Sequence, residues 1–353
     1  MRIAQVAPLH ESVPPRLYGG TERVISYLTE ELVGMGHDVT LFASGDSVTT
    51  AKLVSPCRNS LRLDPNCVDT VAHHFLLMEQ VAQRAENFDI VHWHIDYFSY
   101  PLSRRMRVPS VTTLHGRLDL KDLVNLYDEF DDIPLISISD NQRTPVPNAN
   151  WQKTVYHGLP PDLYTFREKK GKYLAFVGRM SREKRVDRAI EIALRTGIEL
   201  KIAAKIQNVD RPYFKEFVEP LLKGPYVEYV GEIGEKEKDA FVGEALALLF
   251  PIDWPEPFGL VMIESFACGT PVIAFNCGSV PEVVKDGVTG YICGTLHEAV
   301  SAVERVGELD RRAVRREFEE RFSSRRMAED YTGIYRKLAE KAAPGLRKTY
   351  RAA

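Results

Sequence analysis

The chain lacks any long hydrophobic run. Its longest apolar stretch, residues 245–252, has about eight residues, well short of the roughly 20 that a membrane-spanning helix needs. The first stretch, MRIAQVAPLH, is also too short for the core of a secretory signal, and Gln5 and Pro8 interrupt it. The sequence therefore predicts neither an integral membrane protein nor a secretory leader.

Paired cysteines and an excess of charge are lacking too. The five cysteines, at 57, 67, 268, 277 and 293, form no C-x-x-C pair, which argues against a disulfide framework or a zinc site. Reduced thiols of this kind are typical of a cytoplasmic protein. A net charge of −3 and a pI near 6.3 give no reason to expect a nucleic-acid partner.

Several motifs of well-known enzymes are missing. The chain has no G-x-G-x-x-G, Walker, G-x-S-x-G or H-E-x-x-H sequence. The acidic run DEFDD at 128–132 is not a D-x-D motif at a strand end, so we expect no carboxylate-held metal and no cofactor. These absences disfavour a dinucleotide oxidoreductase, a P-loop enzyme, a serine hydrolase and a zinc protease.

What is present is an alternation of short apolar runs with amphipathic helices. A chain of 353 residues with 44% hydrophobic and 27% charged residues fits two globular domains. Apolar runs separated by helical segments predict βα units on parallel sheets, in an α/β fold of two doubly wound domains facing each other across a cleft. The expected strands are 3–7, 39–43, 90–94, 110–114, 135–138, 173–177, 200–204, 227–230, 247–251 and 272–275, with a first helix at 21–33 and a linker at 157–171.

Two carboxylates stand out in the stretch DWPEPFGLVMIESFACGTPV, residues 253–272. Glu256 lies in a Pro-rich loop and Glu264 lies inside an apolar helix, with Gly259 at the turn between them. The N–H groups of Phe258, Gly259 and Leu260 would point out of the helix N-terminus, which favours anions and hydroxyl oxygens. This layout suits a ligand with hydroxyls at both ends and phosphates in the middle. The alternative is that Glu264 only caps local backbone groups.

A basic pair follows another expected strand. In FVGRMSREKR, residues 176–185, Arg179 comes directly after the strand and Lys184 lies near the next helix. Ligands bind at such strand ends in open α/β sheets, and an Arg with a Lys can hold a diphosphate without a metal. In the alternative interpretation, Arg179 pairs with a local acid and Lys184 is solvated.

Two weaker candidates lie in the first half. Gly19 and Gly20 form a loop between the first strand and the first helix, where the backbone can approach a ligand closely. His115, at the end of the strand in TTLHGRLD, could donate a hydrogen bond to a sugar hydroxyl or to a reacting oxygen. A buried histidine satisfied by the backbone is the alternative.

These motifs, in this order, resemble glycosyltransferase family 4, whose members are retaining enzymes of the GT-B fold. The resemblance rests on YGGTERV, GHDVTLFAS, DIVHWH, TLHG and FVGRMSREK, and most of all on residues 256–292, EPFGLVMIESFACGTPVIAFNCGSVPEVVKDGVTGYI. The chain is most similar to the bacterial subgroup that builds surface or extracellular glycans. The resemblance implies two Rossmann-like domains: an acceptor-binding domain at 1–160, joined by a C-terminal helix in the segment after about residue 323 that crosses back at about 335–353, and a donor-binding domain at 161–334.

The resemblance also implies roles for individual residues. The catalytic set is Glu256 near the donor sugar, Arg179 and Lys184 on the diphosphate, and His115 near C6 of the sugar and the reaction centre. The donor-binding set is Gly19, Gly20, Arg179, Lys184, Lys205, Ile233, Glu256, Phe258, Gly259, Leu260 and Glu264, with Glu264 on the ribose. Asp96, Tyr97 and Arg117 are candidates for the acceptor pocket. The chain departs from the family at His157-Gly158, where Asn-Gly is usual, and at AAKIQNVD, 203–210, where a Gly-rich turn is usual.

The implied reaction is transfer of a hexose to an acceptor hydroxyl with retention, by a metal-independent front-face mechanism. UDP-glucose is the first choice of donor, UDP is favoured over GDP, and the acceptor is a glycan or a lipid-linked glycan. The basic C-terminal segment leaves contact with the inner membrane surface open, although a solvated helix face is the simpler interpretation. The alternatives are a GT-B-fold nucleotide-sugar epimerase, a nicotinamide oxidoreductase and an inactive binding homologue.

Overall fold

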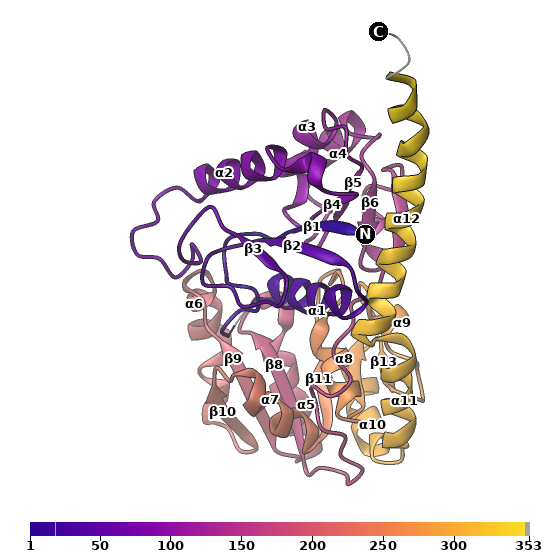
Figure 1. The fold of residues 1–353 in the computed structure, drawn as a ribbon. Coiled ribbons are helices and arrows are strands. Elements are labelled where there is room, and N and C mark those ends of the chain that lie inside the picture. The colour runs from indigo at the N-terminus through magenta and orange to yellow at the C-terminus, as the bar shows by residue number, and fades with distance from the viewer. Residues whose placement is uncertain (18, 350–353) are drawn as a thin grey trace. The chain divides into compact units, whose positions relative to one another are not determined.

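The computed structural model describes residues 1–17 and 19–349, with side chains up to residue 342. The chain forms two compact units, one made of Met1–Gly158 and the helix that begins at Ser324, the other of Leu159–Ser323. Figure 1 shows a sheet with flanking helices in each unit. The two doubly wound α/β domains expected from the sequence are confirmed.

The first unit contains a seven-stranded parallel sheet in the order β3-β2-β1-β4-β5-β6-β7. Its strands are β1 (Arg2–Val6), β2 (Asp38–Phe42), β3 (Lys52–Val54), β4 (Ile90–Trp93), β5 (Ser110–Thr113), β6 (Leu135–Ser137) and β7 (Trp151–Thr154). Its helices are α1 (Gly20–Gly34), α2 (Thr70–Ala82), α3 (Tyr100–Ser103), α4 (Lys121–Glu129) and α12 (Ser324–Thr349).

The second unit contains a six-stranded parallel sheet in the order β10-β9-β8-β11-β12-β13. Its strands are β8 (Tyr173–Arg179), β9 (Leu200–Lys205), β10 (Val227–Gly231), β11 (Ala245–Phe250), β12 (Val272–Phe275) and β13 (Gly290–Cys293). Its helices are α5 (Val186–Thr196), α6 (Arg211–Tyr213), α7 (Glu235–Gly243), α8 (Leu260–Ala267), α9 (Val280–Val283), α10 (Leu296–Val306) and α11 (Arg311–Arg321).

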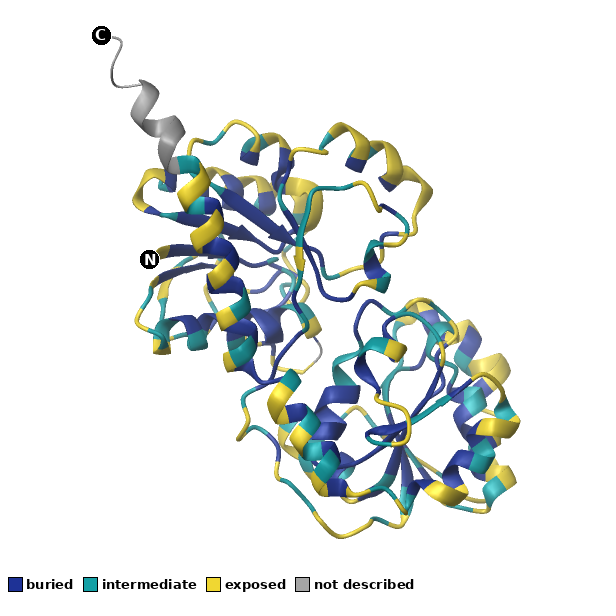
Figure 2. Ribbon diagram, turned by 90° about the vertical axis from the view of Figure 1, so that its right-hand side faces the viewer, coloured by how far each residue is buried: buried dark blue, intermediate teal, exposed yellow. Residues whose placement is uncertain are grey.

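Burial of both sheet faces explains why the central strands are nearly continuous apolar runs. In β1, Ala4 and Val6 pack with Leu77 of α2 on one face, because side chains alternate along a strand. Gln5 points to the opposite face, where it bonds to Tyr335 of α12. Figure 2 shows the central strands in the colour of buried residues and the outer faces of the helices exposed.

Each strand expected from the sequence is present, but β3, β7 and β13 were missed. All three lie at a sheet edge, where a strand has only one paired neighbour and needs less apolar surface. The sequence of β7, WQKT, is mostly polar, and β3 has only three residues. Edge strands of this kind have too weak a hydrophobic pattern to be found by periodicity.

The C-terminal helix α12 belongs to the first unit from Ser324 onward, as expected for the segment after about residue 323. It packs against α1 and β4, and Tyr331 and Tyr335 are its buried anchors. The hydroxyl of Ser324 also donates a hydrogen bond of 2.6 Å to Glu31 of α1. The last residues of the expected segment, 350–353, lie outside the described residues.

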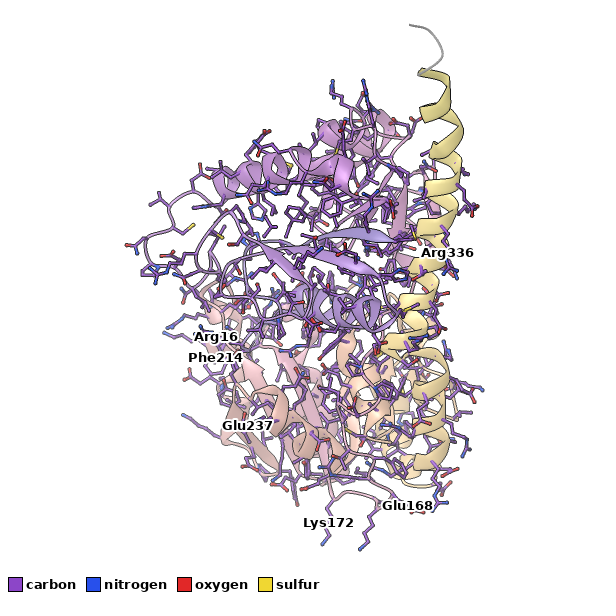
Figure 3. The ribbon with its side chains drawn as sticks, in the orientation of Figure 1. Arg16, Glu168, Lys172, Phe214, Glu237 and Arg336 are labelled. Carbon is purple, nitrogen blue, oxygen red and sulfur yellow. The ribbon has the colours of Figure 1, made fainter. Side chains whose placement is uncertain are left out.

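The stretch expected to be a linker is bound to the second unit over most of its length. The backbone amide of Leu159 donates to the carbonyl of Phe322, and Arg167 forms an ion pair of 2.8 Å with Asp239 of α7. Further along, the side chains of Glu168 and Lys172 point outward from the end of that unit (Figure 3). Because its backbone is anchored at several points, residues 159–171 are part of the second unit's fold.

Candidate active site

The predicted donor-binding residues of the second unit gather at the carboxyl edge of its sheet. The strand order reverses between the neighbouring strands β8 and β11. The chain continues from β8 to β9 on one side of β8, whereas β11 lies on its other side. Ligands bind in open α/β sheets at such a switch point. Arg179 ends β8, Lys205 is its register partner at the end of β9, Ile233 follows β10, and Glu256 follows β11.

Lys184 and Glu256 come together from two different loops. The ammonium Nζ of Lys184 bonds to the carboxylate Oε2 of Glu256, and the indole Nε1 of Trp254 donates to the same oxygen at 2.9 Å. The ammonium also lies 5.5 Å from the ring centroids of both Phe250 and Trp254. Aromatic faces attract a cation, so these rings help to hold Lys184 at the carboxylate.

Arg179 is held between two acids that sequence reasoning missed. Its Nη2 donates to Glu183 Oε2 at 2.9 Å, and its Nε lies 3.2 Å from Asp210 Oδ2. Desolvation raises the pKa of the buried Asp210 carboxyl, and the charge of Arg179 opposes that rise. The alternative in which Arg179 pairs with a local acid is therefore met, although this pairing leaves the guanidinium at the same edge of the sheet.

The turn before α8 has the conformation that the sequence pattern required. Gly259 has φ 82°, and a Cβ there would lie 2.9 Å from Phe250 Cζ and Met262 Cε. Only glycine adopts that backbone without strain in such close packing. The amides of Gly259 and Leu260 donate no hydrogen bond to any residue that the structure describes. They are donors available to an anion or a hydroxyl.

The loop after β12 holds this turn in place by hydrogen bonds and close packing. The Ser279 hydroxyl donates to the Phe258 carbonyl at 2.7 Å, and the Ser279 amide donates to the Glu256 carbonyl at 3.0 Å. Gly278 has φ 59°, and a Cβ there would lie 2.4 Å from the Glu256 amide nitrogen. The CGS sequence after β12 therefore supports the loop that carries Glu256 and Phe258.

Glu264 lies on the buried side of α8 and has one strong partner. Its Oε1 accepts from Lys238 Nζ of α7 at 2.8 Å, and only 4% of the Glu264 side chain is exposed. None of the described residues donates to its other oxygen, Oε2. A buried carboxylate is stable here because Lys238 compensates its charge, and Oε2 can still accept a ligand hydroxyl.

The other second-unit candidate with a side-chain partner is Lys205. Its Nζ lies 3.5 Å from Glu232 Oε1, in the loop after β10. Both side chains are about one-third exposed, so this pair contributes little to stability. It keeps the ammonium at the same edge as Arg179.

In the first unit, His115 lies at the carboxyl end of β5, where it was expected. Its Nε2 lies 2.9 Å from His94 Nδ1, and its ring stacks on His157 with centroids 5.4 Å apart. Burial lowers the pKa of His115 to about 3, so the ring is neutral at physiological pH. No backbone group of the described residues bonds to either ring nitrogen of His115. Instead, Nδ1 is buried without a hydrogen-bond partner among the described residues.

The glycine loop of the first unit is bent tightly. Gly19 has φ 150°, and a Cβ there would lie 2.8 Å from Pro15 Cβ. Directly after it, Glu22 in the first turn of α1 is buried, and desolvation raises the pKa of its carboxyl to about 7. Glu22 was missed, although it lies within the YGGTERV motif.

The acceptor candidates are spread over two loops. Asp96 has φ 50° and begins a short 3-10 helix, Asp96–Ser99, directly after β4, and Tyr97 stacks on Phe98. Arg117 follows β5 and donates to both oxygens of Asp119, at 2.6 and 2.7 Å. Those two hydrogen bonds lower the pKa of Asp119. The three candidates lie at the carboxyl edge of the first sheet, like His115.

A surface cavity of about 420 Å³ in the second unit contains none of the predicted residues. Arg185 and Arg188 line it together with Asp253, and Arg185 is already paired with Asp187 and Asp253. Its charges are compensated internally. We therefore do not include this cavity in the candidate site.

Neither a metal-binding cluster nor a membrane-crossing helix is present among the described residues. Among them, no group of three or more His, Cys, Asp or Glu side chains is placed to hold a metal ion. No helix in that part of the chain has the length and apolarity needed to cross a membrane.

Comparison with known proteins gives matches over most of the chain. Residues 18–141 match the model for Glycosyltransferase Family 4, and residues 165–323 match that for Glycosyl transferases group 1. An N-acetyl-alpha-D-glucosaminyl L-malate synthase from Bacillus anthracis is 29% identical over 304 residues, which are 73% of this chain and 77% of the relative.

Solved structures share the fold over nearly the whole length. AviGT4, a glycosyltransferase involved in avilamycin A biosynthesis, aligns with a TM-score of 0.73 at 23% identity, over 96% of this chain and 98% of AviGT4. Alr3699/HepE of Anabaena, solved in complex with UDP and glucose, aligns with a TM-score of 0.73 at 17% identity, over 96% of this chain and 100% of HepE. With both family models placed in order along two parallel-sheet units, the chain belongs to the family 4 type of glycosyltransferases and has the GT-B fold.

Proposed function

We propose that this protein transfers a hexose from a nucleotide sugar, UDP-glucose as the first choice, to an acceptor hydroxyl with retention and without a metal. The observation that carries the proposal is the contact between Lys184, Glu256 and Trp254 at the switch point of the second sheet. It joins a diphosphate-binding cation to a carboxylate suited to sugar hydroxyls. The HepE structure with UDP and glucose makes UDP-glucose the first donor to test.

The charges of this edge suit a diphosphate. In the ligand-free chain Lys184 and Arg179 are paired with carboxylates, and their side chains are only 21% and 29% exposed. A diphosphate can replace those carboxylates as partner, and in a partly desolvated site each charge-assisted hydrogen bond is strong. As the bond from the sugar to the phosphate breaks, charge develops on the diphosphate, and the two cations stabilise it.

The fixed geometry of Glu256 supports a front-face route. The Trp254 indole donates to Glu256 Oε2, and this bond remains when a diphosphate replaces Glu256 on Lys184, so this oxygen is not a free nucleophile for the anomeric carbon. In the proposed step the acceptor oxygen bonds to the anomeric carbon on the face that the diphosphate leaves. The acceptor proton passes to the departing phosphate oxygen, so charge and atoms balance. Positioning then supplies much of the rate enhancement.

Several further roles are part of the same proposal. The free Oε2 of Glu264 accepts from the ribose hydroxyls, and the Gly259 and Leu260 amides bind the phosphates or sugar hydroxyls. His115 contacts the sugar, Gly19 and Gly20 approach the phosphates, and Asp96, Tyr97 and Arg117 contact the acceptor. The acceptor itself is a glycan or a lipid-linked glycan, and the product is a surface or extracellular glycan. We propose that the reaction takes place in the cytoplasm, with contact at the inner membrane surface as the alternative to a solvated C-terminal helix.

Retention of the anomeric configuration can be tested without knowing the acceptor. Water replaces the acceptor slowly in such enzymes, so the protein incubated with UDP-glucose should release glucose, and proton NMR at early times should detect the α-anomer. Addition of EDTA should leave the rate unchanged. Release of the β-anomer first would contradict retention, and loss of activity in EDTA would contradict the metal-free site.

A further inference from the structure

A continuous chain of buried hydrogen bonds links the C-terminal helix to His115. From α12, the Tyr335 hydroxyl accepts from Gln5 Nε2 at 3.0 Å. The side-chain oxygen of Gln5 lies 2.8 Å from His94 Nε2. His94 Nδ1 in turn lies 2.9 Å from His115 Nε2. Gln5, His94 and Tyr335 are all buried, so water does not compete for these bonds.

The donor and the acceptor of each hydrogen bond in this series follow from the bond between Gln5 and Tyr335. Because Gln5 donates through Nε2, it presents its oxygen to His94, and an oxygen of this kind only accepts. His94 Nε2 therefore carries the proton. Desolvation and the nearby His92 keep the pKa of His94 well below its ordinary value, so the ring is neutral and its Nδ1 is an acceptor.

The same reasoning fixes the proton on His115. Its Nε2 faces the bare Nδ1 of His94, so Nε2 must carry the proton for a hydrogen bond to form. The ring of His115 is neutral too, because burial lowers its pKa to about 3. That leaves Nδ1 of His115 with a lone pair, and this atom is the one buried without a partner.

A second branch agrees with this direction. The Tyr335 hydroxyl, having accepted from Gln5, can donate to His92 Nδ1 at 2.6 Å. His92 Nε2 then donates to Thr113 Oγ1 at 2.7 Å, and the hydroxyl of Thr113 donates to that of Tyr331 at 3.1 Å. Each hydrogen bond of this branch then has one donor and one acceptor, in agreement with the first branch. Linked hydrogen bonds of this kind strengthen one another.

We propose that α12 is a positioning element that fixes the tautomer of His115 through Tyr335, Gln5 and His94, so that His115 meets its ligand as an acceptor at Nδ1. A buried acceptor without a donor costs free energy, and a ligand hydroxyl removes that cost. This corrects the expectation that His115 donates to a sugar hydroxyl. The assignment of the hydroxyl to a sugar rests on the proposed function, but the tautomer does not.

The first test is the tautomer of His115 in the ligand-free protein. Protein labelled with ¹⁵N-histidine is studied by two-bond proton–nitrogen correlation NMR, which separates a protonated ring nitrogen from a bare one. The His115→Gln variant assigns the signals. We expect His115 to have a protonated Nε2 and a bare Nδ1. A protonated Nδ1, or an averaged pair of signals, overturns the proposal.

The second test uses two tyrosines of the same helix. Tyr335→Phe removes the hydroxyl that orients Gln5, so the His115 signals should average between two tautomers. The matched control is Tyr331→Phe, because Tyr331 is equally buried and its hydroxyl contacts Thr113 outside the branch that leads to His115. It should keep the wild-type tautomer. Equal spectra for the two variants, whether both altered or both unaltered, contradict the positioning role.

The activities of the same two variants are an independent test. Tyr335→Phe should lower kcat about fivefold, the equivalent of one neutral hydrogen bond of about 1 kcal/mol, with Tyr331→Phe within about twofold of wild type. If Tyr335→Phe fails to fold, Gln5→Leu removes the oxygen that accepts from His94, and its His115 signals should average in the same way; an unchanged tautomer would contradict the proposal. A protein with the expected tautomer but no transfer or hydrolysis of any nucleotide sugar would refute the proposed function and leave the tautomer assignment intact.

Discussion

The carboxyl edges of the two sheets carry opposite chemistry on the same kind of fold. In the second unit the edge is charged, with Lys184 against Glu256 and Arg179 against Glu183. In the first unit it is lined with neutral imidazoles, and His94 and His115 bond to each other there. Fold alone therefore does not determine the chemistry of a switch point; the side chains at the strand ends do.

Burial accounts for the difference in charge between the two sheet edges. The charged side chains of the second edge are partly exposed and pair with one another. The histidines of the first edge are too buried to take up a second proton, and a neutral ring can only donate or accept hydrogen bonds. A charged edge suits phosphates, and a neutral hydrogen-bonding edge suits hydroxyls.

The largest expected effect comes from removing a cation of the charged edge. Arg179→Ala should lower kcat by about 10²–10³, because one donor to the developing charge is lost. Arg182→Ala is the matched control, since Arg182 is exposed in the same loop and its guanidinium lies over the Phe217 ring, 5.0 Å from the centroid. Steady-state kinetics with the donor gives the comparison. Equal rates for Arg179→Ala and wild type would refute the role of Arg179.

The neutral edge predicts a pH effect on stability through Glu22. The pKa of its carboxyl is raised from 4.5 to about 7 in the folded chain. The folded chain keeps a proton that the unfolded chain releases, so stability falls as pH rises between these values. Glu22→Gln should gain on wild type by at most about 3 kcal/mol in unfolding free energy between about pH 4 and about pH 8.

Urea unfolding at both pH values measures this gain. The control is Glu86→Gln, which alters an exposed carboxyl of the same unit. A Glu22→Gln variant whose advantage is the same at both pH values would show that burial does not hold the proton.

Glu264 tests whether the charged edge also binds neutral hydroxyls. In Glu264→Gln the ribose hydroxyls lose a charged acceptor that serves ground and transition states alike, so KM should rise about tenfold with kcat within about twofold. Glu244→Gln, an exposed acid of the same unit, is the control. A large fall in kcat with unchanged KM would instead assign Glu264 to the chemical step.

The smallest effect is expected at Trp254. Trp254→Phe keeps the aromatic face near Lys184 but removes the indole N–H that bonds to Glu256. Glu256 is partly exposed, so loss of one hydrogen bond of about 1 kcal/mol should lower kcat/KM about fivefold. Trp151→Phe in β7 removes an indole donor to the Val146 carbonyl and should leave activity unchanged. Equal activities of the two variants would show that Trp254 does not position Glu256.

The sequence predicted the central strands and the two-domain α/β fold because buried parallel strands are strongly apolar. It missed β7, whose WQKT sequence is mostly polar, because an edge strand needs little apolar surface. It did not show which residues anchor the mixed-charge helix α12. Tyr331 and Tyr335 are the residues that anchor it.

The positions of the candidate residues could be predicted, but their partners could not. Arg179 and Glu256 lie next to apolar strands, so the edge of the sheet followed from periodicity. Lys238, the partner of Glu264, is 26 residues away in a different helix, and no local pattern links the two. The link from Gln5 to Tyr335 spans 330 residues, and only the folded chain brings them together.

The most direct test of the central claim is a thermal-shift comparison of nucleotide sugars. Wild-type protein is melted with UDP-glucose, UDP-galactose, UDP-N-acetylglucosamine, GDP-mannose, ADP-glucose or NAD, each with and without EDTA. A donor at about 100 times its Kd stabilises by about 2.7 kcal/mol, so UDP-glucose should raise Tm by several degrees with EDTA having no effect. A shift with NAD alone, or with none of the six, would contradict a diphosphate-sugar site at the charged edge.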